Sequence, residues 1–78
     1  MQAEEMKALL LAALPGAEVK VVTVDDVHFQ ARVVAAEFAG QPTLARHRMV
    51  YAALGERMGG EVHALSLRTL APAEAGNA

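Results

Sequence analysis

Two histidines, His28 and His63, are the residues of this 78-residue chain that are best suited to metal chemistry, because a neutral imidazole nitrogen binds borderline metals. The chain has no cysteine, which excludes disulfides and any metal site built on its own thiolates. A closed metal site needs about four ligands. The two imidazoles therefore predict a shared site, in which a thiol-bearing partner supplies the other ligands. The alternative is that His28 is a turn residue and that His63 is a hydrogen-bonded residue at a strand edge.

A second candidate site is cationic. The turn from Gly40 to Thr43 leads into Arg46, His47 and Arg48, and cations in the first turn of a helix oppose its macrodipole. Helix N-terminal N–H groups beside arginines can bind nucleic-acid phosphates. The alternative is a solvated first turn in which Arg46 pairs with a neighbouring acid. A net charge of −2 and an aromatic content of 4% offer no global attraction to nucleic acid and little base stacking.

Catalytic chemistry has little support in the sequence. Ser66 lies in a predicted strand with no base in reach, and Asp25 and Asp26 lie in a predicted turn, where side chains commonly bond to the backbone. A chain of this size buries only roughly 60 to 65% of the surface that its unfolded form exposes. That leaves little room for the concave site that an enzyme needs. We therefore expect a protein that is not an enzyme.

The composition is that of one ordinary globular domain over residues 1–78, with 54% hydrophobic and 21% charged residues. The first five residues are acidic where a signal peptide would be basic. The longest apolar run, from Ala8 to Leu14, is far shorter than the roughly 18 residues of a membrane span. These features predict a cytoplasmic location.

Hydrophobic periodicity predicts the elements that must position these residues. The expected ranges are a helix over 3–14, strands over 19–24 and 28–36, a helix from about Thr43 to a cap at Gly59-Gly60, and a strand over 61–69. In the second strand Phe29, Ala31 and Val33 alternate with polar positions. Residues 71–78 are expected to form a flexible tail or a frayed helical turn.

The order helix, strand, strand, helix, strand predicts how the two histidines meet. Two strands joined by a crossover helix normally run parallel in one sheet, so the strands that begin near His28 and Glu61 are expected to be neighbours. His28 and His63 then lie at the same end of the sheet, within reach of one ligand. The alternation complicates this pairing, because His63 alternates with core-facing leucines whereas His28 alternates with Gln30.

The chain resembles the BolA family. The resemblance rests on a set of short motifs between Ala17 and Pro72, and the pairing of a His-Arg-x-Val-Tyr run with a downstream His-Ala is quite specific. The matching residues are Phe38-Ala39-Gly40, Arg46-His47-Arg48-Met49-Val50-Tyr51, Leu54, His63-Ala64-Leu65-Ser66, Thr69 and Pro72. The resemblance implies an α+β fold of the class II KH-like type, in which a three-stranded mixed sheet packs against helices.

The resemblance also implies a partner and a cofactor. BolA-like proteins bind monothiol glutaredoxins, and the two proteins hold a 2Fe-2S cluster between them. Glutaredoxin cysteine and glutathione supply the thiolates, while His63 and His28 match the BolA-like ligands. A monomer would then form a heterodimer with its partner, in iron-sulfur cluster trafficking or iron and redox regulation.

The alternative function that the family implies is a KH-like, DNA-binding transcriptional regulator. Its surface would comprise the Gly40 turn, Thr43 and the helix start at Arg46, His47 and Arg48. Two departures from the family pattern concern these sites. The turn 25–27 lacks the glycine that often precedes the loop histidine, and Gln41 replaces a frequent lysine.

Overall fold

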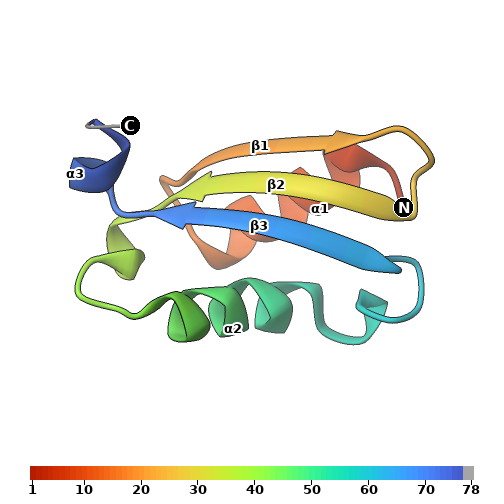
Figure 1. Ribbon diagram of the computed structural model, residues 1–78. Helices are drawn as coiled ribbons and strands as arrows, with labels where there is room; N and C mark the ends of the chain where they lie inside the picture. The colour runs from red at the N-terminus through yellow and green to blue at the C-terminus, as the bar shows by residue number, and fades with distance from the viewer. Residues whose placement is uncertain (77–78) are drawn as a thin grey trace.

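The computed structural model describes residues 1–76 as a small mixed sheet with its helices (Figure 1). The elements are α1 (Ala3–Ala13), β1 (Glu18–Thr23), β2 (His28–Val34), α2 (Thr43–Leu54), β3 (Ala64–Leu70) and α3 (Pro72–Ala75), with short 3-10 turns η1 (Ala36–Phe38) and η2 (Gly55–Arg57). The first five helices and strands follow the predicted order. Within these 76 residues, no helix is long and apolar enough to cross a membrane.

The sheet has the strand order β1-β2-β3. β1 and β2 are antiparallel, while β2 and β3 are parallel and joined by the α2 crossover. In the parallel pair His28 is opposite Ala64, so the first residues of both strands lie at the same end of the sheet. The predicted α+β class and the three-stranded mixed sheet are confirmed.

The hydrophobic core lies between one face of the sheet and the helices α1 and α2 (Figure 1). The predicted alternation in β2 is confirmed, because Phe29, Ala31 and Val33 are buried while His28 and Gln30 are exposed. The largest fully buried side chains are Phe38, Met6, Leu10, Leu54, Val33, Val50 and Val62. Helices α1 and α2 each contribute residues one turn apart to this core, as an amphipathic helix does.

The end of α2 differs from the prediction. The helix stops at Leu54 and not at Gly59-Gly60, because Gly55 takes a positive φ of 57° that a right-handed helix excludes. A hydrogen-bonded turn follows, in which the Val62 N–H donates to Arg57 O (2.9 Å) and the Gly59 N–H to Val62 O (2.8 Å).

This turn also corrects the predicted third strand. β3 begins at Ala64 and not at residue 61. Val62 is fully buried and His63 is exposed, the reverse of what an alternating strand predicted for these two positions. The reason is that residues 61–63 belong to the turn, where side chains no longer alternate between the two faces of the sheet. Because of this turn, the side chain of His63 lies at the surface and not in the core.

The described part of the C-terminal segment contains a short helix. Residues Pro72–Ala75 form α3, with proline in the first turn, where its missing N–H costs no helical hydrogen bond. The backbone N–H of Ala71 donates to Glu74 Oε1 at 2.7 Å, which closes this turn. Of the two forms predicted for this segment, the helical turn is the one that the structure shows at Pro72–Ala75, and residues 77 and 78 lie outside the described part of the chain.

Candidate functional site

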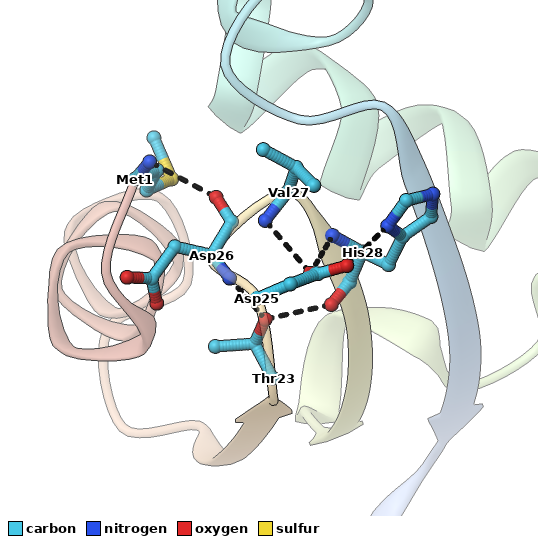
Figure 2. A network of polar contacts seen from close by, with 6 residues as sticks. All are labelled: Met1, Thr23, Asp25, Asp26, Val27 and His28. Atoms are coloured by element: carbon cyan, nitrogen blue, oxygen red, sulfur yellow. Dashed lines mark hydrogen bonds and ion pairs between the residues drawn. The ribbon is translucent and has the colours of Figure 1, made fainter.

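The loop between β1 and β2 is held by side-chain hydrogen bonds to its own backbone (Figure 2). Asp25 Oδ1 accepts the N–H groups of Val27 (3.1 Å) and His28 (2.8 Å). Thr23 Oγ1 accepts the N–H of Asp26 and donates to the carbonyl of His28 at 2.7 Å. Asp26 takes a positive φ of 62°, a conformation that aspartate tolerates better than most residues. The loop therefore fixes the backbone of His28 without a glycine before it.

The second carboxylate oxygen of Asp25 binds the imidazole of His28. Asp25 Oδ2 lies 2.7 Å from His28 Nδ1 (Figure 2). An ionised carboxylate only accepts hydrogen bonds, so Nδ1 carries the proton that this contact needs. In the neutral ring the lone pair is then on Nε2. The contact with Asp25 therefore fixes the orientation of the His28 ring and leaves its Nε2 without a proton.

His63 is positioned by the same loop. Its backbone N–H donates to the carbonyl of Val27 at 2.8 Å, and the next N–H, of Ala64, donates to that carbonyl at 3.3 Å. The His28 and His63 rings lie with their centroids 6.2 Å apart and their planes at 71°. The sequence prediction that the two histidines lie together is confirmed. Both side chains are at the surface, where a partner can reach them.

These two imidazoles do not make a complete metal site. Among the described residues, no group of three or more His, Asp or Glu side chains is placed to hold a metal ion, and the whole chain has no cysteine. The 2.7 Å contact with His28 already occupies one oxygen of Asp25, the acid beside the pair. A metal ion at this pair would need its remaining ligands from another molecule.

Arg46 is buried, and its proposed place in an exposed cationic surface is wrong. Only 9% of the residue is exposed. Its Nε donates to Gln41 O (2.8 Å), and its Nη1 donates to Thr69 O (3.1 Å) and to Glu74 Oε1 (2.6 Å). Nη2 completes a two-point contact with Glu74 Oε2 at 3.2 Å. Of the alternative interpretation, the pairing of Arg46 with an acid is confirmed, whereas its solvated position is wrong.

The other residues of the predicted nucleic-acid surface lie apart from the histidine pair in the sequence and on other elements. Gly40 is exposed and has a φ of 75°, which favours glycine at this turn. Thr43 and Arg48 are exposed on α2. His47 is half-buried, and its ring meets Tyr51 edge to face at a centroid distance of 6.4 Å. Arg46 to Arg48 lie after the first turn of α2, which begins at Thr43.

Two carboxylates have a lowered pKa in the folded protein. Hydrogen bonds from the His28 and Val27 N–H groups lower the pKa of Asp25 from 3.8 to about 2. Arg46, and then the Ala71 N–H, lower the pKa of Glu74 from 4.5 to about 2. Stability from a lowered pKa is fully present above the unfolded-state value and is lost as the pH falls through the folded-state value.

We therefore expect the urea midpoint of unfolding to fall as the pH is lowered from about 5 to about 2. The measurement is a series of urea titrations followed by far-ultraviolet circular dichroism. The control is the double variant Asp25→Asn/Glu74→Gln, which lacks both shifted groups and should show a flatter pH dependence. Parallel pH profiles for the two proteins would contradict the assignment.

Sequence reasoning missed the side-chain roles of Asp25 and Glu74. The backbone role of Asp25 in the turn was predicted, but its second oxygen and the ring of His28 were not paired. The spacing of three residues between Asp25 and His28, across a turn, is the sequence signal that could have revealed this side-chain pair. Glu74 lies 28 residues from Arg46 in a segment expected to be flexible, so no local pattern joined the two.

The chain matches the family model described as BolA-like protein over residues 10–74. Its fold is similar to the structure of a bolA protein homologue from Coxiella burnetii, with a TM-score of 0.84 and 38% sequence identity. That alignment covers 97% of this chain and 97% of the other.

Two curated relatives share the central part of the sequence. BolA-like protein 1 of Homo sapiens is 47% identical over 49 residues, which are 63% of this chain and 36% of that protein. The DNA-binding transcriptional regulator BolA of Escherichia coli is 45% identical over 42 residues, which are 54% of this chain and 40% of that protein. The matched segments span well under half of either relative.

Proposed function

The chain belongs to the BolA-like protein family, and from that membership we propose that it is a non-enzymatic adapter, which binds a monothiol glutaredoxin and co-ligates a bridging 2Fe-2S cluster. One observation carries the proposal: His28 and His63 lie side by side at the surface, with ring centroids 6.2 Å apart. The absence of cysteine suits a partner that brings the thiolates together with glutathione.

The chain's own residues have separate tasks in this mechanism. Asp25 holds the His28 ring with its Nδ1 proton turned toward the carboxylate, so that Nε2 is available to iron. The Val27 carbonyl fixes the backbone at His63. The cluster, when bound, supplies one-electron chemistry. Histidine ligands in place of thiolates raise the potential of a 2Fe-2S centre, so His28 and His63 would favour its reduced form.

The test is to mix the purified protein with a cluster-loaded monothiol glutaredoxin and glutathione, and to record visible absorption and circular dichroism. We expect the protein to change both spectra, because imidazole nitrogen replaces another ligand of iron. His63→Ala and His28→Ala should lose most of that change. His47→Ala is the matched control, since its ring contacts Tyr51 on α2 and should leave the change intact.

Two results would count against the proposal. One is a glutaredoxin spectrum that the wild-type protein does not alter. The other is a His63→Ala spectrum that equals the wild-type one while a pull-down still shows the complex, which would leave a protein interaction without shared ligation.

Nucleic-acid binding is the second candidate function. It is favoured by the similarity to the Escherichia coli relative, a DNA-binding transcriptional regulator. Of the surface that the sequence suggested, Gly40, Thr43 and Arg48 are exposed, but Arg46 is committed to Glu74 and to backbone carbonyls. A single exposed arginine is a weak phosphate site. Phosphate binding by this chain therefore needs further cations from another part of the fold.

A further inference from the structure

Three cations cross the sheet in one row, on the face opposite the core. Lys20 of β1 is in register with Arg32 of β2, and Arg32 is in register with Arg68 of β3. Residues in register point to the same side of a sheet, and neighbouring strands lie about 4.8 Å apart. The row therefore spans roughly 10 Å across all three strands. Lys20 and Arg68 are exposed, and Arg32 is half-buried.

The charges of this row are not neutralised within the described residues, where no ion pair involves any of the three side chains. Glu18 is the acid that the strands place on this face, and it lies opposite Val34, one row away. Like charges directly opposite in a sheet are destabilising. The whole protein has a net charge of −2, so the row is a local exception and not part of a generally basic surface. Fold stability does not explain it.

The row forms one side of a shallow groove of about 360 Å³. The neighbouring row, Val22, Gln30 and Ser66, is also in register across the strands and lines the same groove. No carboxylate lines it. Lysine and arginine side chains only donate hydrogen bonds, while glutamine and serine can donate as well. The chemistry of the groove therefore selects a ligand with several anionic acceptor oxygens.

We propose that the row of Lys20, Arg32 and Arg68 binds the phosphodiester backbone of a nucleic acid. The guanidinium groups offer flat two-point contacts that match phosphate oxygens, and a linear array of cations matches a ligand whose charges repeat along a chain. The face carries no Phe, Tyr or Trp on its strands, so binding is by charge and independent of base sequence. The inference rests on the nucleic-acid-binding candidate and names a surface for it that differs from the Gly40 turn.

The experiment measures binding of a short fluorescein-labelled single-stranded DNA by fluorescence anisotropy between about 50 and 200 mM salt. Three phosphate contacts predict a slope of log affinity against log salt of about −2. We expect the triple variant Lys20→Ala/Arg32→Ala/Arg68→Ala to bring this slope close to zero and to weaken binding at the lowest salt by roughly tenfold or more.

The chain offers a matched control in the triple variant Lys7→Ala/Arg48→Ala/Arg57→Ala. It removes the same types and number of cations from exposed positions outside the row, and we expect it to keep most of the affinity and the slope. Circular dichroism checks that both variants fold, and a glutamine version of the row variant replaces the alanine one if that does not.

Four outcomes would overturn the inference. Equal losses of DNA affinity in the two triple variants would show that binding depends on net charge and not on this row. Loss in the control variant alone would keep nucleic-acid binding and move it to the positions of Lys7, Arg48 and Arg57. Tighter binding of a poly-glutamate peptide than of DNA would identify an acidic protein as the ligand. DNA binding that is absent at the lowest salt removes the second candidate function together with its surface, and the spectra with glutaredoxin test the first function separately.

Discussion

Arg46→Ala is expected to lower the melting temperature by roughly 10 °C, a large effect for a domain of this size. Arg46 is 9% exposed. Its guanidinium donates to the backbone carbonyls of Gln41 and Thr69 and to both carboxylate oxygens of Glu74. Its Cζ also lies 5.9 Å from the centroid of the buried Phe38 ring. Alanine leaves the two carbonyls without these donors and separates α3 from α2.

The control for this prediction is Arg48→Ala, which removes the same side chain from an exposed position two residues away and should change the melting temperature little. Arg46→Lys should not restore stability, because an ammonium group cannot serve three acceptors in the planar geometry of a guanidinium. Thermal unfolding followed by circular dichroism measures all three variants. Equal melting temperatures for the alanine variants, or full recovery with lysine, would contradict the buried role of Arg46.

Asp25→Asn is expected to weaken cluster sharing by roughly 10- to 100-fold, the usual cost of losing a partner that orients a metal-binding histidine. The reason is that the substitution changes which of the two side chains donates the hydrogen bond. An asparagine whose oxygen still accepts the Val27 and His28 N–H groups turns its amide N–H toward His28 Nδ1. The neutral ring must then accept at Nδ1 and carry its proton on Nε2, which removes the lone pair that iron needs.

The measurement has a readout that does not depend on the cluster. Long-range proton–nitrogen NMR spectra of the protein alone distinguish a ring protonated on Nδ1 from one protonated on Nε2. We expect the first form in the wild type and the second in Asp25→Asn, with Asp25→Ala showing a mixture. Titration of cluster-loaded glutaredoxin then gives the affinities. An unchanged tautomer in Asp25→Asn would disprove the orienting role, even if the affinity fell for another reason.

The fold was largely predictable from local patterns and one topological rule. Alternation placed Phe29 and Val33 in the core, and the crossover rule placed the strand of His28 beside the last strand. The end of α2 was not predictable, because a single glycine is tolerated inside a helical pattern. Whether Gly55 continues the helix or takes its positive φ depends on the turn that follows and not on its neighbours in sequence.

The candidate sites depended more strongly on tertiary structure. The nearness of His28 and His63 followed from strand order, but the exposure of His63 followed from a turn that alternation could not reveal. The prediction that Arg46 is part of an exposed surface was wrong because its partner, Glu74, lies in a segment whose composition predicted flexibility. The row of cations could not be predicted from the sequence, because Lys20, Arg32 and Arg68 lie on three separate strands. Only the pairing register of the strands shows that they are neighbours.

The parallel pairing of β2 with β3 also sets the order in which the chain acquires its candidate ligand pair. The β1–β2 hairpin is a local structure, whereas β3 joins only after the intervening α2 segment has been brought round. Contacts of this separation carry a loop-closure cost and form late in folding. A chain that ends before His63 therefore lacks one of the two imidazoles. Under the proposed function, cluster sharing would itself report that synthesis and folding of the domain are finished.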